Sequence, residues 1–157
     1  MKFKRPESVL VMIYDHKDQV LVMQRNDDPE FWQSVTGTIE ADELPIETAI
    51  REVLEETGID VIVEGFDIVD TRVVNQFDIR PQWRHKYPPG EFTNTEYVFS
   101  VCVNSDIPIT LTEHTEYRWL NAEEARNLVW SHSNRDAISR HFFPFESVFS
   151  ANESRKN

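Results

Sequence analysis

Apolar residues form two nearly continuous runs early in the chain, separated by a short polar stretch. The first run is SVLVMIY, residues 8–14, the second is QVLVMQR, residues 19–25, and DHKD lies between them. Runs of this length around a polar turn are typical of buried strands joined as a hairpin or a sheet meander. Further strands are predicted at WQSVTG (32–37), VIVE (61–64), FDIVDTRVV (66–74), EYVFSVCV (96–103), ITLTE (109–113) and YRWL (117–120).

A helical period replaces the strand pattern between residues 45 and 57. The residues that share its core face are Ile46, Ala49, Ile50, Val53 and Thr57. Pro45 suits the first helical turn, and Gly58 suits the left-handed position that ends a helix. Shorter helices are predicted at AEEARNLV (122–129) and NRDAISRHF (134–142). Strands around one long helix, followed by short helices, predict an α+β fold of the α/β/α sandwich type.

Three acids lie near the C-terminal end of the predicted long helix. Glu52, Glu55 and Glu56 centre on the side opposite the core face, so we expect them to be exposed. Like charges at these spacings repel by a few tenths of a kcal/mol per pair, and the C-terminal end of a helix disfavours anions. A solvated acidic face is one interpretation. A bound divalent cation is the other, because it would turn each repulsion into an attraction.

The surroundings of these acids favour the metal interpretation. Residues 37–59 contain seven acids and a single basic residue, Arg51. Carboxylate ligands without His or Cys beside them select hard cations such as Mg²⁺, with Mn²⁺ as an alternative. We therefore expect a divalent-cation site on this helix.

The same stretch resembles the signature of a known family. Gly37, Glu43 and the run REVLEETGI, residues 51–59, match every defined position of the Nudix box. The resemblance implies a Nudix fold, a mixed β-sheet flanked by helices in which the box forms a loop, a helix and a second loop. It also implies hydrolysis of a nucleoside diphosphate that is linked to another group.

The resemblance assigns roles to the residues of the box. It makes Glu52, Glu55 and Glu56 ligands of the metal. Glu43, Arg51, Gly37 and Gly58 are then structural: Glu43 and Arg51 pair to fix the preceding loop, and Gly37 leaves room for a close backbone approach.

A phosphoanhydride resists attack because its oxygens are negative, so metal-dependent hydrolysis also needs a group that takes a proton from water. The choice of this general base stays open between Glu52, Glu56 and an acid from a later loop. Glu113, expected at the end of the strand 109–113, is the best later candidate, and the resemblance also makes it a further metal ligand. An ordinary surface acid is the alternative for Glu113.

Similarity to one group within the Nudix family extends beyond the box. The segments are KRP (4–6), DDPEFWQSVTG (27–37), RHKYPPG (84–90), NTEY (94–97), TEHTEYRWL (112–120) and SHSNRDAI (131–138). They are similar to members that release pyrophosphate from 7,8-dihydroneopterin triphosphate in folate biosynthesis. That similarity implies substrate contacts at Lys4, Arg25, Thr36 and Ser131. Arg84 is a further candidate because it lies in a loop, residues 80–90, where cations alternate with aromatic residues.

Charge and length limit the possible partners and the domain count. The formal net charge of -12 argues against a nucleic acid polymer or an anionic membrane, and favours a small-molecule triphosphate held through a cation. We expect one Nudix domain over residues 1–145 and a flexible tail over residues 146–157. The run VLVMIY is too short to span a membrane and precedes no cleavage site, which predicts a cytoplasmic protein.

Two other functions compete with the folate assignment. A (d)NTP pyrophosphohydrolase that sanitises the nucleotide pool, such as an 8-oxo-dGTP diphosphatase, would carry the same box and differ in the ring pocket. A Nudix-fold module that binds without catalysis is the remote alternative, because such a module would normally have lost residues of the box. Oligomeric state cannot be predicted from these patterns.

Overall fold

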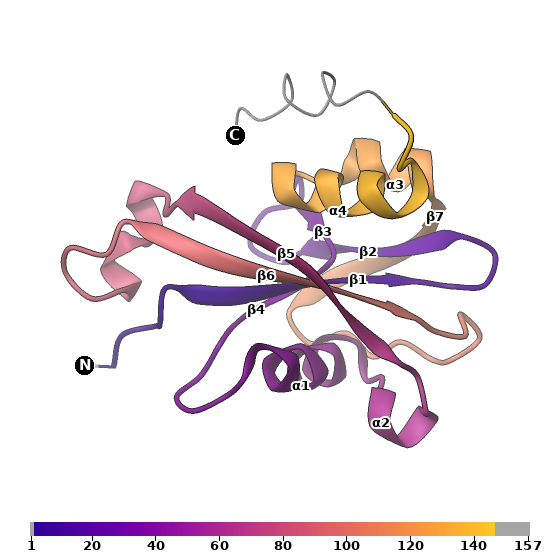
Figure 1. Cartoon of the computed structure of the whole chain (residues 1–157), viewed down its shortest axis with the longest axis horizontal. Coiled ribbons are helices and arrows are strands. Elements are labelled where there is room, and N and C mark those ends of the chain that lie inside the picture. Colours follow the sequence, from indigo (N-terminus) through magenta and orange to yellow (C-terminus); the bar gives the residue numbers. More distant parts are fainter. Residues whose placement is uncertain (1, 147–157) are drawn as a thin grey trace.

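The computed structural model describes residues 2–146, which form one mixed sheet between two layers of helices (Figure 1). The strands are β1 (Glu7–Tyr14), β2 (Gln19–Arg25), β3 (Trp32–Gln33), β4 (Val35–Thr38), β5 (Ile68–Asp78), β6 (Thr93–Cys102) and β7 (His114–Asn121). The α-helices are α1 (Pro45–Thr57), α2 (Val61–Glu64), α3 (Ala122–Leu128) and α4 (His132–Phe142), and η1 (Pro81–Lys86) is a 3-10 helix. The tail predicted over 146–157 lies outside the described residues from position 147 onward.

Strand β1 is the centre of the sheet. It pairs in parallel with β6 along its whole length, and its other edge pairs antiparallel with β4 and then, at Tyr14, with β2. Strand β2 also pairs with β3 and β7, and β5 pairs antiparallel with β6 at the far edge. Since only β1 and β6 run parallel among the described strands, the sheet is mixed, as predicted.

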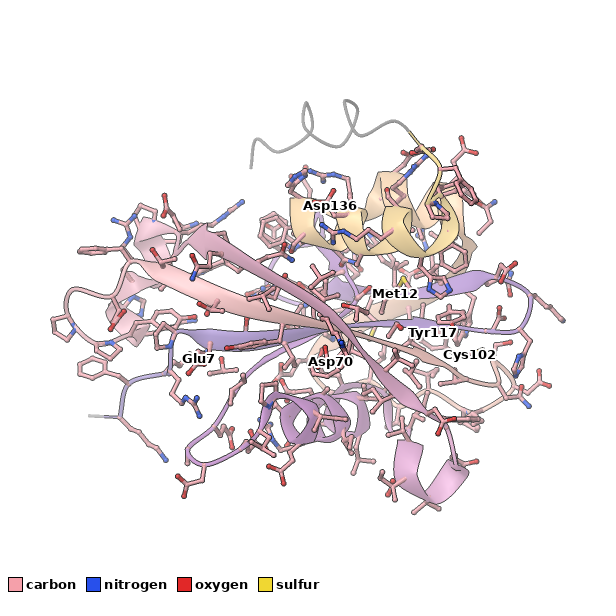
Figure 2. All side chains as sticks on the ribbon, viewed as in Figure 1. Glu7, Met12, Asp70, Cys102, Tyr117 and Asp136 are labelled. Atoms are coloured by element: carbon pink, nitrogen blue, oxygen red, sulfur yellow. The ribbon has the colours of Figure 1, made fainter. Side chains whose placement is uncertain are left out.

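The two faces of the sheet carry separate apolar clusters. Helices α1 and α2 lie below the sheet in Figure 1, and α3 and α4 lie above it. Val9, Val11 and Ile13 of β1 pack with Ala49 and Val53 of α1 on one face. On the other face Met12, labelled in Figure 2, packs with Val20, Val22 and residues of α3. The α/β/α sandwich is therefore confirmed, and it follows from the alternation of side chains along β1.

The long helix begins and ends where the sequence predicts. Pro45 occupies its first turn, and Gly58 ends it with φ of 81°. The Gly58 N–H donates to the Leu54 carbonyl at 2.9 Å, which is the single bond of an αL ending. This boundary fixes where the acids of the last two turns lie.

The predicted strand VIVE is wrong, because residues 61–64 form helix α2. The Asp60 carboxylate accepts from the N–H groups of Ile62 and Val63, and Gly65 ends the short helix with φ of 74°. Ile62 and Val63 are 66% and 77% exposed, so the apolar run does not mark a buried strand. Two capping residues outweigh the β-propensity of the residues between them.

The predicted strand ITLTE is also wrong, because residues 109–113 have no regular structure. Their polar groups instead pair with the end of α1: the Thr110 N–H donates to the Thr57 carbonyl, and the Thr112 hydroxyl donates to the Glu55 carbonyl, at 2.8 and 2.9 Å. Helix ends leave carbonyls without intrahelical partners, and this segment supplies the missing donors. Its apolar residues pack on the core below the sheet.

Smaller differences concern boundaries. WQSVTG divides into β3 and β4, with Ser34 between them, and the loop predicted over residues 80–90 contains the 3-10 helix η1. Strand β5 continues four residues beyond the predicted end at residue 74. Within residues 2–146 no helix is long and apolar enough to cross a membrane.

Candidate active site

Glu52 lies against the backbone of Gly37, which joins helix α1 to strand β4. A Cβ atom added at Gly37 would overlap the carboxylate of Glu52, so only glycine leaves room for this acid. Gly37 sits inside β4, paired with Val9 of β1, and its position is therefore fixed by the sheet. The structure accordingly gives Gly37 the role of admitting a close approach, here by a side chain.

Arg51 connects the loop before α1 to the acids on the helix. Its guanidinium grips Glu43 through two bonds, Nε to Oε2 at 2.6 Å and Nη2 to Oε1 at 2.8 Å. It also donates to the Thr38 carbonyl at 3.1 Å, to Glu52 at 3.0 Å and to Glu55 at 3.2 Å. The Arg51 guanidinium lowers the pKa of Glu43 to about 2, so this pair stays charged at any ordinary pH.

The expectation that all three acids are exposed is wrong for Glu56 and largely wrong for Glu52. Glu56 is 3% exposed, and the Glu52 side chain is 12% exposed, whereas that of Glu55 is 55% exposed. Strand β4 and the start of β7 cover this side of α1: Thr36 and His114 both lie beside the Glu56 carboxylate. The expectation came from the direction in which each side chain leaves the helix axis. That direction does not tell which neighbouring elements cover the side chain.

Burial and mutual repulsion hold these carboxyls toward their neutral forms. Burial, helped by Glu55 and Glu113 and opposed by Arg51, raises the pKa of Glu52 to about 8. Burial, with the charges of Glu52 and Glu113, raises the pKa of Glu56 well above its usual value. A positive charge beside these two acids would favour their ionised forms and so lower both pKa values.

The donor set fits a hard divalent cation. Of the residues that the structure describes, none makes a hydrogen bond of ordinary geometry to either carboxylate oxygen of Glu56. An orphaned buried carboxylate is costly, and a cation bound by oxygen ligands removes that cost. Within residues 2–146 no three His, Cys, Asp or Glu side chains lie close enough together to hold a metal ion as they stand. The fit to a divalent cation therefore rests on the type of ligand, carboxylate oxygen, and not on a preformed arrangement of three ligands.

Glu113 precedes strand β7, and does not end a strand as predicted. Its charge nevertheless acts on the pKa values of Glu52 and Glu56, and also on those of Lys4 and Arg25. The structure thus brings this acid, predicted from a distant part of the chain, to the acids of α1. It also places two cations on the same side of the site.

The predicted substrate residues differ in how they are held. Arg25 ends β2 and is bound by Asp27 at 2.8 and 2.6 Å, and the Lys4 N–H bonds the Lys86 carbonyl at 2.8 Å. The Thr36 hydroxyl accepts from Gln33 at 3.3 Å, and the Ser131 hydroxyl caps α4 through the Asn134 N–H at 3.1 Å.

Arg84 points elsewhere. Its Nε donates to the Ile79 carbonyl at 2.9 Å, and its guanidinium lies 5.0 Å from the Phe92 ring, so it braces its own loop. A substrate contact at Arg84 stays a prediction.

A chain of buried polar groups behind Glu56 was not foreseen. The Trp130 indole N–H, which can only donate, points at Gln33 Oε1 at 3.4 Å, and this turns the Gln33 amide nitrogen toward His114 Nε2 at 3.2 Å. His114 Nε2 is then the acceptor, and the proton lies on Nδ1, 3.9 Å from Glu56 Oε1. Burial lowers the pKa of His114, which favours this neutral form. The one feature of the sequence that pointed to this chain of polar groups was the position of His114, directly after the candidate Glu113.

Comparisons with known proteins agree with this geometry. A family profile described as NUDIX domain matches residues 4–143. The chain is 45% identical over 139 residues to the dihydroneopterin triphosphate diphosphatase of Escherichia coli (strain K12), covering 88% of this chain and 93% of that protein. It is 40% identical over 144 residues to the Haemophilus influenzae protein of the same name, covering 91% of each.

A solved structure gives the same picture. The structure of the E. coli dihydroneopterin triphosphate pyrophosphohydrolase matches with a TM-score of 0.83 at 44% identity, over 89% of this chain and 97% of that one. The likeness therefore extends over most of both chains.

Proposed function

This chain belongs to the NUDIX domain family, and on that premise we propose that it hydrolyses 7,8-dihydroneopterin triphosphate to the monophosphate and pyrophosphate, a step of folate biosynthesis. The observation that carries the proposal is the buried Glu56 carboxylate, whose oxygens accept no hydrogen bond of ordinary geometry from the described residues. Glu56 and Glu52 lie on an intact box, and the charge of Glu113 acts on both. The 45% identity to a relative named for this activity supports the choice of substrate.

In the proposed mechanism Glu52 and Glu56 hold Mg²⁺, Glu55 and Glu113 contribute from the rim, and Mn²⁺ can substitute. When bound there, such an ion would neutralise charge on the phosphate chain and lower the pKa of the attacking water. Gly37 and Arg51 keep Glu52 in one position, because the first admits the carboxylate and the second bonds it. The general base is one of Glu52, Glu56 and Glu113.

The remaining residues bind and orient the substrate. Lys4 and Arg25 place positive charge beside the acids, where the outer phosphates of a triphosphate need it. Thr36 and Ser131 offer hydroxyl groups to the substrate. The partner is a small-molecule triphosphate. We also place the protein in the cytoplasm.

The test is a side-by-side assay of pyrophosphate release with Mg²⁺. The substrates are 7,8-dihydroneopterin triphosphate, dATP, dGTP and 8-oxo-dGTP. We expect the pterin to have the highest kcat/KM and the nucleotides to be cleaved more slowly, because the ring pocket alone distinguishes them. A tenfold or greater preference for 8-oxo-dGTP would assign the protein to nucleotide-pool sanitation, and no release from any substrate would make it a binding module.

The metal site needs its own control in the same assay. Glu56→Gln should remove most Mg²⁺-dependent activity, because it removes a charged oxygen ligand from the buried site. Glu123→Gln, which neutralises an exposed acid on α3, should leave activity unchanged. Equal losses in the two variants would contradict the assignment of Glu56.

A further inference from the structure

A cavity of about 180 Å³ lies between the loop after β2 and the 3-10 helix η1. The loop contributes Asp27, Asp28 and Phe31, and the helix contributes Gln82 and Trp83. Arg25 and Arg80 complete the lining. Its volume is below the roughly 300–1,000 Å³ of sites that enclose a whole drug-sized ligand. The cavity therefore suits one flat ring system, with the rest of the ligand outside.

The cavity adjoins the acids through Arg25. This side chain lines the cavity, and Arg25 pairs with His114 of β7, the residue directly after Glu113. The N–H of the next residue, Asn26, donates to the Glu113 carbonyl at 3.4 Å. A ligand whose ring occupies the cavity would thus pass its phosphates over Arg25 toward the acids of α1. The site thus offers a ring cavity, then an arginine, then the carboxylates. A triphosphate has its parts in the matching order: the ring, the phosphate chain and the phosphoanhydride that is cleaved.

Flat aromatic and guanidinium groups form the walls. Arg80 lies 5.2 Å from the Phe31 ring, 5.5 Å from the Trp83 ring and 4.8 Å from the Trp130 ring. Phe31 stacks on Trp130 with centroids 4.5 Å apart and an interplanar angle of 12°, which holds Phe31 rigid. Such surfaces bind the face of a heteroaromatic ring without regard to its substituents, so selectivity must come from its edge.

Asp28 is the charged group of the lining that is free to bond that edge. Gln82 also lines the cavity, but its amide both donates and accepts and so does not select an edge of N–H donors. The neighbouring Asp27 is occupied by both bonds to Arg25. Asp28 accepts the Glu30 N–H on Oδ1 at 3.0 Å, and none of the described residues bonds its Oδ2. An ionised carboxylate only accepts hydrogen bonds. Its natural complement is a ring edge that presents adjacent N–H donors.

We propose that this cavity is the ring subsite, that Asp28 accepts the N–H donors of a guanine-like edge, and that Arg80 and Trp83 hold the ring face. The inference deepens the proposed function and rests on it for the identity of the ligand. Pterin and guanine rings both present a ring N–H beside an amino group. Adenine presents a ring nitrogen without hydrogen there, so Asp28 disfavours it.

The first experiment measures binding without catalysis. Dihydroneopterin monophosphate, dGMP and dAMP are titrated into the metal-free full chain by calorimetry. Asp28→Asn keeps the Oδ1 acceptor of the turn, yet should weaken the pterin and guanine ligands about tenfold or more relative to dAMP. The ratio between ligands is the readout, because neutralising Asp28 changes the attraction for phosphate equally in all three.

A second variant tests the walls of the cavity. Arg80→Lys keeps the positive charge and removes the planar guanidinium, so it should weaken the pterin and guanine ligands several-fold through lost stacking. Arg126→Lys is the matched control, because Arg126 also rests on a ring, 4.2 Å from Phe143, but lies on α3. We expect Arg126→Lys to bind all three ligands as the unaltered protein does.

Binding and hydrolysis measurements together separate an error in the ring subsite from an error in the proposed function. If the protein cleaves the pterin triphosphate and Asp28→Asn keeps the guanine-over-adenine ratio, the ring subsite is wrong and the function stands. If ligands bind with the expected ratios but no triphosphate is hydrolysed, the subsite stands and the function is wrong. Wild-type affinity for all ligands in both variants would overturn the subsite even if one variant were less stable.

Discussion

At the scale of single residues, the site depends on contacts that keep Glu52 in place. Gly37 presents bare backbone to the Glu52 carboxylate, and Arg51 bonds the same carboxylate while it holds Glu43. The resemblance to the Nudix box implied that Glu43 and Arg51 pair and that Gly37 admits a close backbone approach. It could not predict that the approaching group is Glu52, because that contact depends on how β4 packs against α1.

Gly37→Ala should damage catalysis more than folding. The added methyl group must push the Glu52 carboxylate away, and displacements of about 1 Å in a catalytic group cost on the order of a hundredfold in rate. Stability should fall by about 1–3 kcal/mol from overpacking. Turnover with Mg²⁺ and urea unfolding measure the two effects. Gly65→Ala, where nothing lies within 4 Å, should leave turnover unchanged; full activity in Gly37→Ala would contradict this role.

Arg51→Lys tests whether the planar fork matters beyond its charge. A Lys ammonium cannot reproduce the paired bonds to Glu43 together with those to Thr38 and Glu52. We expect turnover to fall about tenfold or more and the free energy of unfolding to fall by about 1 kcal/mol. Arg126→Lys, which alters a pair with Glu146, serves as the control. Unchanged turnover in Arg51→Lys would reduce the pair to a surface contact.

At the scale of elements, capping decides where sequence patterns succeed and fail. Helix α1 was predictable because Pro45 and Gly58 mark its ends and an apolar face lies between them. The run at residues 61–64 has strand-like composition, but Asp60 and Gly65 close it as a helix. The run at residues 109–113 pairs with the carbonyl end of α1 and not with a strand. Such pairing is tertiary, and no pattern within the segment encodes it.

Gly58→Ala should destabilise the end of the helix that carries the acids. An L residue at φ of 81° is strained by about 1–2 kcal/mol, and the new Cβ would lie 3.2 Å from the Thr110 Cβ. Gly90→Ala is the matched control, since Gly90 has φ of 90° and nothing within 4 Å. Urea unfolding should show a larger loss at Gly58 than at Gly90. Equal losses would mean that the contact with Thr110 adds nothing.

At the scale of the whole molecule, acidic charge is unevenly distributed. The net charge is -12, and residues 37–59 hold seven acids with one basic residue. The structure buries two of these acids and leaves the oxygens of Glu56 without hydrogen bonds from the described residues. Keeping these carboxylates together therefore lowers the free energy of unfolding. A ligand that binds only the folded state can raise it again.

The stability of the metal-free protein should therefore fall as pH rises. Carboxyls whose pKa is lowered by folding give the opposite dependence. The pKa of Glu52 is raised to about 8 and that of Glu56 is raised as well, whereas unfolded carboxyls titrate near about 4.3. Between these values the folded state binds more protons than the unfolded state, so stability falls as pH rises. Glu43, with its pKa of about 2, adds an opposing slope only near its unfolded value of about 4.3. His114 and His141, whose pKa values are lowered by burial, oppose the fall below their unfolded value of about 6.5.

The measurement is the melting temperature of chelator-treated protein between about pH 6.5, the unfolded pKa of histidine, and about pH 8, the raised pKa of Glu52. We expect the melting temperature to fall with rising pH and Mg²⁺ to restore it most at the alkaline end, where the carboxyls are ionised and the ion binds best. Glu56→Gln should flatten the slope and leave the metal-free protein at least as stable, because the amide buries no charge. Glu123→Gln should keep the slope, since that acid is exposed. A melting temperature that rises across this interval, or a drop of many degrees in Glu56→Gln, would mean that these acids stabilise the fold by themselves and that their burial has no connection with a metal.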